Sequence, residues 1–373
     1  MKILLVSLQG IGNSVLITPA IKYLYKQGHI LDMVVSDNNS YRIVEALGIL
    51  RKIFIYKEKE NFFKNALRLK KELKADKHEV VYAMYPNGRR ENILSFYLSK
   101  ENKGGIKDRQ GYWKMFCFLL RQTLALDKDG HDIINNLKLV GAPEFYQDSK
   151  PLIVVPLKIA EEVANSYFPN TDNRFTLILH PFSSKKQGLW NIYNYIYICQ
   201  RLAREKKIRI VVAGSPDESE LMDIITKKVC EGIEKYTKSN ILCAAAFINH
   251  SDLFLCSDSS LMHISAALGK PTIAIWGFTD YQRTSPYGEN SLIIRKDIDC
   301  SPCYDFVYGL RKNCQFNRAC LNKLDKEIVY KIISTVIDEI KEKKTMQAIQ
   351  LNSIENIKNI TTLWSGCRMI TIN

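Results

Sequence analysis

The sequence predicts an α/β protein of two doubly wound domains, each an open, mostly parallel sheet with helices on both faces. Two observations support this fold class. Short apolar, β-rich runs alternate with helical segments along most of the chain, which is typical of parallel sheets covered on both sides. A length of 373 residues is also enough for two domains that each bury their own core.

The first domain is expected over residues 1–150. Its opening run, KILLV at 2–6, is continuously apolar and predicts a buried strand, and residues 14–27 predict the helix that follows. The same unit then repeats, with predicted strands at 32–36, 52–56 and 79–85 and predicted helices at 41–47, 62–74 and 92–99.

The second domain is expected over residues 151–344, after a turn-rich segment around 141–156 that interrupts the pattern. It has predicted strands at 152–155, 176–180, 209–213, 253–257 and 272–276 and predicted helices at 193–205, 218–230, 261–268 and 325–343. The tail at 345–373 is polar and weakly patterned, so no structure is assigned to it.

The composition limits the partners and the compartment. The chain has 53 Lys and Arg against 39 Asp and Glu, an excess of 14 positive charges that favours phosphate-rich partners; a biased genome composition would explain the same excess. No apolar segment is long enough for a signal peptide or a membrane span, so we expect a cytoplasmic protein. Its ten cysteines are then expected as thiols or metal ligands rather than disulfides.

Three segments at predicted strand ends have the chemistry of a nucleotide site, because ligands bind at the carboxyl edge of an open α/β sheet. CSDSSLMH at 256–263 places small hydroxyl residues at a helix start, where free N–H groups attract anions; an N-cap with a satisfied histidine is the alternative. HPFSSKK at 180–186 adds hydroxyls and lysines that suit phosphate. AGSPDE at 213–218 adds carboxylates that suit ribose hydroxyls.

The turn SLQGIGN at 7–13 lies between the first strand and its helix. Gly10 and Gly12 permit a close approach of a ligand to the backbone. Val15, however, stands where a dinucleotide fingerprint needs a third glycine or an alanine. A purely structural turn is equally consistent with these residues.

Together these segments resemble a known family. GIGNSVLITPAIKYL, HPFSSKK followed by a tryptophan, AGSPDE and above all SDSSLMHISAALGKPTIAIWGFTDYQRTSPYG are similar to the bacterial lipopolysaccharide heptosyltransferases, glycosyltransferase family 9. The likeness extends roughly over residues 1–340, and the stretch at 258–288 is its most specific part.

The resemblance implies a GT-B fold, in which two Rossmann-like domains face a central cleft. It further implies transfer of heptose from ADP-heptose with inversion, acceptor binding by the first domain, donor binding by the second, and no essential metal. By match to the family motifs, the donor-binding residues are Ser183, Ser184, Lys185, Lys186, Glu218 (or Asp217), Asp258, Ser259, Ser260, Leu261, Met262 and His263.

The sequence departs from the family pattern at three places. The family has an aspartate as general base where this chain has Asn13, and an amide cannot accept a proton near neutral pH. The family's lysine two residues before the tryptophan is Gly188 here, so a nearby lysine would have to replace it. The family's D-S-G-P reads Asp258-Ser-Ser-Leu261; since these residues keep their backbone N–H groups, we expect phosphate binding to persist.

Four cysteines form the pattern C-x2-C-x10-C-x5-C, namely Cys300, Cys303, Cys314 and Cys320. Four thiolates suit tetrahedral zinc or iron, and some autotransporter heptosyltransferases hold iron with four cysteines. Free thiols packed in a small lobe at 300–320 are the alternative. In either case we expect the four residues to lie close together.

Residues 51–77 carry ten Lys and Arg against four Asp and Glu. The apolar side chains of the helix predicted there are expected on one face, namely Phe62, Phe63, Ala66, Leu69 and Leu73. This gives either a core-facing helix with a solvated basic back or a surface that docks on an anionic membrane. No nucleic-acid-binding module is recognisable, so nucleic acid is not expected as a partner.

The leading hypothesis is a heptosyltransferase, cytoplasmic or peripheral on the inner membrane, that transfers the sugar of an ADP-sugar to a phosphorylated glycolipid core. One alternative is a catalytically weakened relative that binds a nucleotide-sugar or a glycan, which Asn13 favours. The other is transfer to a protein acceptor, which the cysteine pattern favours.

Overall fold

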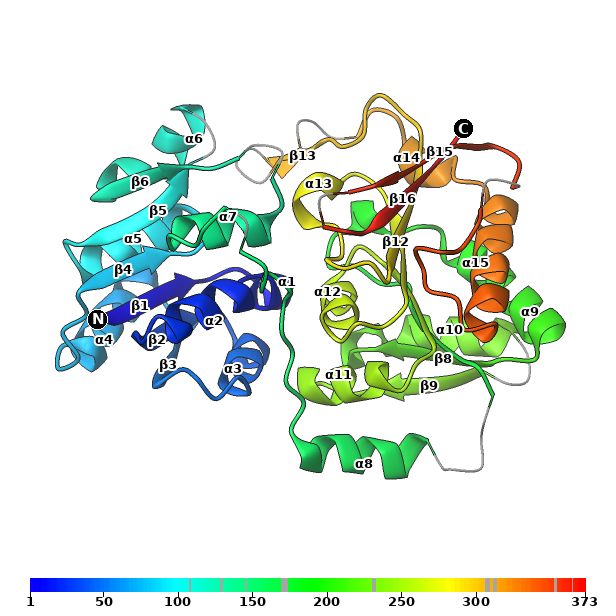
Figure 1. The fold of residues 1–373 in the computed structure, drawn as a ribbon, viewed down its shortest axis with the longest axis horizontal. Helices are drawn as coiled ribbons and strands as arrows, with labels where there is room; N and C mark the ends of the chain where they lie inside the picture. The colour runs from blue at the N-terminus through cyan, green and yellow to red at the C-terminus, as the bar shows by residue number, and fades with distance from the viewer. Residues whose placement is uncertain are drawn as a thin grey trace. The chain divides into compact units, whose positions relative to one another are not determined.

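The computed structural model describes residues 1–106, 109–127, 130–144, 146–168, 174–229, 233–305, 309–310, 314–351, 354–363 and 365–373. The chain divides into two compact units, Met1–Val154 and Val155–Asn373. Each unit has its own sheet, dominated by parallel pairing and flanked by helices (Figure 1). The predicted fold class of two doubly wound α/β units is therefore confirmed.

The first unit contains a sheet with the strand order β3-β2-β1-β4-β5-β6, and all its pairings are parallel. The order reverses between β1 and β4, where an open α/β sheet binds its ligands. The strands are β1 Lys2–Ser7, β2 Ile30–Val35, β3 Lys52–Ile55, β4 Val80–Ala83, β5 Asn102–Ile106 and β6 Gln122–Ala125. The helices are α1 Ile11–Leu16, α2 Thr18–Lys26, α3 Asn38–Glu45, α4 Phe62–Leu73, α5 Arg89–Leu98, α6 Arg109–Lys114 and α7 Asp132–Leu139, with a 3-10 turn at Cys117–Leu119.

The second unit contains a sheet with the order β15-β16-β12-β11-β10-β7-β8-β9, in which only the β15–β16 pair is antiparallel. Its order reverses between β7 and β10. The strands are β7 Thr176–His180, β8 Arg209–Gly214, β9 Ile233–Thr237, β10 Leu253–Ser257, β11 Thr272–Trp276, β12 Ser291–Lys296, β15 Ile357–Thr362 and β16 Arg368–Ile372, beside a small ribbon of β13 Tyr304–Asp305 and β14 Gly309–Leu310. The helices are α8 Leu157–Tyr167, α9 Ile192–Lys206, α10 Ser219–Val229, α11 Ile241–Asn249, α12 Ser260–Ala267, α13 Tyr281–Thr284, α14 Ala319–Asn322 and α15 Lys326–Lys341, with 3-10 turns at Lys186–Gly188 and Pro216–Glu218.

The strongly patterned segments have the predicted structure. The strands predicted at 176–180, 253–257 and 272–276 are β7, β10 and β11 with those bounds. The helix predicted at 14–27 is instead two helices, α1 and α2, that meet at Ile17. The strand predicted at 152–155 is wrong: Leu152 donates its backbone N–H to the Thr18 hydroxyl (2.8 Å), so a helix side chain holds this apolar segment in place of a strand.

The core face of α4 also differs from the prediction. Ala66, Leu69 and Leu73 are buried against the strands, but Phe63 is exposed. Neighbouring helix positions lie far apart around the axis, so Phe62 and Phe63 cannot both face the sheet. Phe62 packs at the edge of the core. No helix within the described ranges is long and apolar enough to cross a bilayer.

The tail at 345–373, which the sequence leaves unassigned, contributes to the second sheet. β16 pairs in parallel with β12 and antiparallel with β15. Ile370 and Ile372 are fully buried in the core of this unit, together with Met346, Ile349 and Leu351. The tail is therefore part of the second fold rather than an appendage.

Candidate functional site

The carboxyl ends of β7, β8 and β10 are neighbours in the second sheet, and each is followed by one of the candidate nucleotide segments. His180 is the buried last residue of β7, and its Nδ1 lies 3.0 Å from the carbonyl oxygen of Ala213 in β8. Burial lowers the pKa of His180, an effect that the charge of nearby Glu218 opposes. His180 thus joins two strand ends beneath the loop that carries Glu218.

Glu218 closes the 3-10 turn that follows β8. Its Oε2 accepts hydrogen bonds from the backbone N–H (2.7 Å) and the hydroxyl (2.9 Å) of Ser215. These bonds fix the carboxylate and leave Oε1 to accept a hydrogen bond from a ligand hydroxyl. Asp217, the other candidate for this role, is exposed.

Four candidate residues follow β7, namely Ser183, Ser184, Lys185 and Lys186. The Nζ of Lys185 lies 3.6 Å from the centre of the Tyr304 ring. Burial raises the pKa of Asp258, and both a hydrogen bond from Thr279 and the charge of Lys185 oppose that rise. Lys185 therefore lies near the end of β10. Both Lys185 and Lys186 are exposed, and Lys186 begins a 3-10 turn.

Arg318 holds this loop from outside and was not among the predicted site residues. Its Nη1 donates to the carbonyl oxygens of Lys186 (3.1 Å) and Leu189 (3.3 Å). The segment around the cysteines thereby anchors the lysine loop.

Gly188 occupies the place of the family's usual lysine. A Cβ there would lie 3.1 Å from the Phe278 ring and 3.3 Å from the Ser183 hydroxyl. A side chain at this position would therefore require Phe278 or Ser183 to move by a few tenths of an ångström. Because this position has no side chain, the Phe278 ring can lie close to it. The Nζ of Lys185 lies 5.9 Å from the centre of that ring.

Asp258 and Ser259 lie between β10 and α12. The Thr279 hydroxyl donates to Asp258 Oδ2 (2.7 Å), which fixes the carboxylate. Ser259 is the N-cap of α12, yet its side chain makes no capping bond, and its Oγ is buried without a hydrogen-bond partner among the residues the structure describes. A structural N-cap uses this oxygen, so the geometry favours a ligand here.

The remaining candidates occupy the first turns of α12. Ser260 and Leu261 are half-buried at its start, and the His263 side chain is largely buried. Met262 is fully buried, and its N–H already bonds to the carbonyl oxygen of Ser259 (3.2 Å). Its side chain thus belongs to the core and is not directed toward a ligand.

In the first unit, the turn after β1 carries the predicted acceptor-side residues. Gly10 is the N-cap of α1, and Gly12 and Asn13 lie in the first helical turn. A Cβ on Gly10 would meet nothing within 4 Å, and its φ of −69° is open to any residue. Packing and backbone conformation therefore do not require glycine at this position.

Glu91 is a buried carboxyl group that contacts this turn and that sequence reasoning missed. Gln9 donates to its Oε1 (2.6 Å), and the Gly88 N–H donates to its Oε2 (3.0 Å). Burial raises the pKa of Glu91, and these hydrogen bonds oppose the rise. The sequence indicates only that Glu91 stands three residues after Gly88, where a helix-capping carboxylate is expected. Its contact with Gln9 arises from the fold.

The comparisons with known proteins match both units. The model of glycosyltransferase family 9 (heptosyltransferase) matches residues 66–312, more than half of the chain. The chain belongs to glycosyltransferase family 9. The resemblance identified from the sequence is thereby confirmed.

This family 9 chain is similar to two curated groups of relatives. It is 27% identical to lipooligosaccharide heptosyltransferase 2 of Campylobacter jejuni over 169 residues, which cover 44% of this chain and 49% of that protein. It is 25% identical to lipopolysaccharide core heptosyltransferase OpsX of Haemophilus influenzae over 238 residues, which cover 62% and 66%. The chain thus spans from half to two thirds of the length of these relatives.

Solved structures of the family share its fold. The ADP-heptose lipopolysaccharide heptosyltransferase II of Escherichia coli aligns with a TM-score of 0.71 at 15% identity, over 92% of this chain and all of that one. A family 9 glycosyl transferase from Veillonella parvula aligns with a TM-score of 0.75 at 19% identity, over 91% and 97%. The fold of this chain is therefore GT-B, as the resemblance implies.

Cys300, Cys303 and Cys314 of this family 9 chain lie near Cys320, as the sequence predicts. Burial, and then the nearby Cys303, Cys300 and Cys314, raise the pKa of Cys320 to about 11. No three or more His, Cys, Asp or Glu side chains in the described ranges are arranged to hold a metal ion. Of the two alternatives for this segment, the structure therefore favours free thiols over zinc or iron. Cys320 is buried on α14, whereas Cys314 is exposed and accepts a hydrogen bond from the Arg318 N–H (3.1 Å).

Proposed function

We propose that this chain transfers heptose, or a related sugar, from an ADP-sugar to a lipopolysaccharide core acceptor with inversion. The second unit would bind the donor and the first unit the acceptor. The family membership and the names of the relatives support the reaction class. The observation that carries the donor assignment is the set of polar groups at the carboxyl ends of β7, β8 and β10.

These groups suit the parts of an ADP-sugar. The ammonium group of Lys185 suits a diphosphate, and so does the Ser259 hydroxyl, which has no hydrogen-bond partner among the described residues. Ser183 and Ser184 add further hydroxyls. The free oxygen of Glu218 suits a ribose hydroxyl. No metal is needed for this set, because a lysine and a helix N-terminus can balance the negative charge of the diphosphate.

The inverting reaction moves one proton and breaks one bond. An acceptor oxygen attacks the anomeric carbon, the bond from that carbon to the phosphate oxygen breaks, and ADP leaves with the electron pair. Lys185 and the hydroxyls would stabilise the charge that develops on the phosphate. The acceptor proton needs a base, and Asn13 can orient the hydroxyl but cannot take the proton. An acceptor phosphate, already ionised, would need no base, and Glu91 is a carboxyl group that contacts the same turn.

The test of the reaction is product analysis. Purified protein is incubated with ADP-heptose and a lipopolysaccharide core acceptor, and mass spectrometry follows the acceptor. We expect the acceptor to gain one heptose and ADP to form in equal amount. If ADP-heptose binds but neither product appears, the chain is a weakened relative that binds the nucleotide-sugar without transfer.

The donor site has a test based on two adjacent lysines. We expect Lys185→Gln to weaken ADP binding about tenfold, because it removes a charge directed toward the diphosphate region. Lys186→Gln is the matched control and should change the affinity less than twofold. Within the described residues the Lys186 side chain makes no ion pair or ring contact, whereas that of Lys185 lies over Tyr304 and acts on Asp258. Calorimetric titration with ADP measures both. Equal effects of the two substitutions would contradict the assignment.

We also propose that the protein acts at the cytoplasmic face of the inner membrane, where a glycolipid acceptor would be found. The first unit carries the surface that supports this proposal.

A further inference from the structure

The outer face of α4 combines exposed apolar side chains with lysines. Phe63 and Leu67 are 79% and 66% exposed and lie one helical turn apart, so they form a pair of exposed apolar side chains on one face. Leu67 follows Phe63 at the helical spacing i+4. Exposed lysines flank the two apolar side chains at i+1, i+7, i+8 and i+11 from Phe63. This surface, called the α4 face below, consists of Phe63, Lys64, Leu67, Lys70, Lys71 and Lys74.

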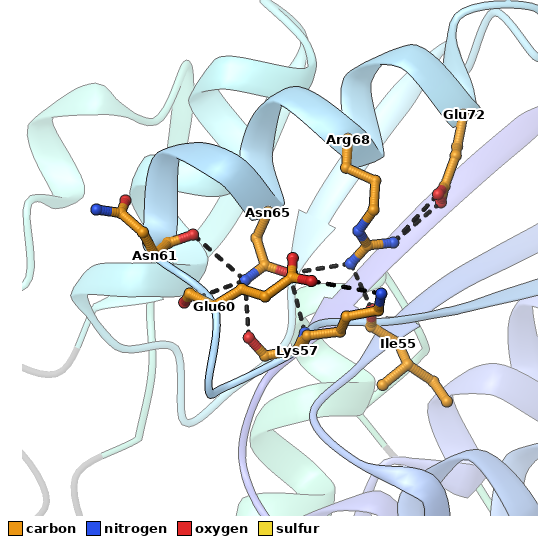
Figure 2. A network of polar contacts seen from close by, with 7 residues as sticks. All are labelled: Ile55, Lys57, Glu60, Asn61, Asn65, Arg68 and Glu72. Atoms are coloured by element: carbon orange, nitrogen blue, oxygen red, sulfur yellow. Dashed lines mark hydrogen bonds and ion pairs between the residues drawn. The ribbon is translucent and has the colours of Figure 1, made fainter.

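A polar network on another side of α4 fixes this orientation. Figure 2 shows Asn65 and Arg68 directed toward the loop that precedes the helix. Asn65 exchanges two hydrogen bonds with the backbone of Lys57 (2.8 and 2.9 Å), and Arg68 donates to the carbonyl oxygen of Ile55 (2.8 Å). Asn65 is buried, and Ala66, Leu69 and Leu73 are packed in the core. The helix therefore cannot rotate to bury Phe63 and Leu67.

The positive charge of the α4 face has no acidic neighbour on the same helix face. Glu72, the acidic residue of α4, pairs with Arg68 (3.2 Å), and Glu60 pairs with Lys57 (3.4 Å). Both pairs belong to the network that faces the loop (Figure 2). Both carboxylates are thus engaged by Arg68 and Lys57 rather than by the lysines of the α4 face.

The apolar and basic character continues beside α4. The Nζ of Lys70 lies 4.2 Å from the centre of the Tyr97 ring on α5, and Phe96 next to it is about half exposed. A cavity of about 430 Å³ opens at the end of α4, with Lys70, Lys74 and Lys77 among its lining residues and Leu73 and Leu98 supplying apolar wall. Two lysines of the α4 face therefore also line a space that could take an anionic headgroup.

We propose that the α4 face docks on a bilayer that contains anionic phospholipid. Phe63 and Leu67 would enter the headgroup region, and the surrounding lysines would contact lipid phosphates. The lysines could also bind the phosphates of a nucleic acid. An exposed aliphatic side chain such as Leu67, however, would gain nothing from contact with a nucleic acid, so the surface favours a membrane. The purpose of this docking, to bring the enzyme to a lipid-linked acceptor, rests on the proposed function.

Vesicle sedimentation tests the docking without any transfer reaction, so docking and catalysis can fail separately. The full chain should bind vesicles of phosphatidylethanolamine and phosphatidylglycerol, should bind pure phosphatidylcholine far less, and should be released at high salt. Lys64→Gln with Lys71→Gln should lower the partition coefficient about 25-fold, roughly fivefold for each lysine. Phe63→Ser with Leu67→Ser should lower it at least about tenfold.

The matched control is on α8 of the second unit, where Leu157 is 73% exposed beside the exposed Lys158. Leu157→Ser with Lys158→Gln removes the same kinds of groups and should leave binding unchanged. All these side chains are exposed, so circular dichroism and the melting temperature should match the wild type. The proposal is wrong if the wild type ignores anionic vesicles, if the α4 variants bind as well as the control, or if RNA binds more tightly than the vesicles and depends on the same lysines.

Discussion

Asp32 is a carboxylate in the middle of the buried strand β2, and two side chains from elsewhere balance its charge. Arg51 donates to both carboxylate oxygens, and Nε2 of His78 lies 2.7 Å from Oδ2. Burial alone would raise the pKa of Asp32, but the hydrogen bonds and charges of His78 and Arg51 outweigh it and lower the pKa to about 2. Removing the charge of Asp32 would leave His78 without its carboxylate partner, whereas Arg51 would keep its ion pair with Asp76 (2.7 Å).

We expect Asp32→Asn to lower the free energy of unfolding by about 2 kcal/mol at pH 7. Because the pKa in the folded state lies below the ordinary value of 3.8, the carboxylate stabilises the fold above about pH 4, and this contribution, about 2 kcal/mol, is lost as the pH falls toward 2. Urea unfolding at several pH values measures the difference. A variant that loses stability as steeply as the wild type between pH 4 and pH 2 would contradict this account.

Asn13 is the residue whose chemistry matters most for catalysis. With a sugar hydroxyl as acceptor, we expect Asn13→Asp to raise the transfer rate tenfold or more, because it supplies the base that an amide cannot provide. The rate of transfer to the same acceptor is compared between variant and wild type. If wild type turns over well and Asn13→Asp is neutral or slower, the base lies elsewhere, and a loss of rate in Glu91→Gln with an unchanged fold would identify it.

The position of the candidate donor-side residues could be predicted because each follows its strand directly, so the short-range pattern places it at the carboxyl edge of the sheet. Their role in binding the donor stays a prediction. Glu91 and Arg318 could not be predicted in this way. Their contacts join residues 82 positions apart, for Gln9 with Glu91, and 132 positions apart, for Lys186 with Arg318. Pattern reasoning also included Met262, since spacing alone does not show which side of a short helix meets the core.

At the scale of the elements, β5 shows why some strands escape sequence reasoning. Its sequence NKGGI contains few β-forming residues, and two glycines weaken any strand pattern. The glycines are needed for packing: a Cβ on Gly104 would lie 2.5 Å from Leu120 Cδ1, and Leu126 covers Gly105 even more closely. A close approach of this kind is a property of the assembled unit and leaves no local signal.

Gly105→Ala should therefore destabilise the first unit by about 1–3 kcal/mol, because Leu126 must move from its packed position. Gln122→Ala in the neighbouring strand β6 is the control, since Gln122 is exposed and its loss should change stability by less than about 0.5 kcal/mol. Guanidinium unfolding followed by circular dichroism measures both. Equal stabilities of the two variants would show that Leu126 has space to relax.

At the scale of the whole molecule, the second unit depends on residues far along the chain. β16 supplies Ile370 and Ile372 to the core, and Arg368 donates to the carbonyl oxygens of Met346 (2.5 Å) and Ile349 (2.9 Å). Deleting residues 352–373 should abolish cooperative folding of the second unit and with it ADP binding, because the edge of β12 and part of the core would be exposed. Calorimetry with and without ADP checks this.

Lys358→Ala provides the control for the deletion, since it removes only an exposed ion pair with Asp297 from the hairpin. Pairs of this kind contribute about 0–1 kcal/mol, so this variant should keep ADP binding. A deleted chain that still binds ADP would show that β16 is dispensable for the donor site.

The pairing of β12 with β16 also has a consequence for biosynthesis. A ribosome completes β12 well before it makes residues 368–372, and in that interval the nascent sheet ends in the apolar strand SLIIRK with an open edge. Open apolar edges pair with other chains. Fast overexpression should therefore yield inclusion bodies, while slower translation at low temperature, or a co-expressed chaperone that covers β12, should raise the soluble fraction.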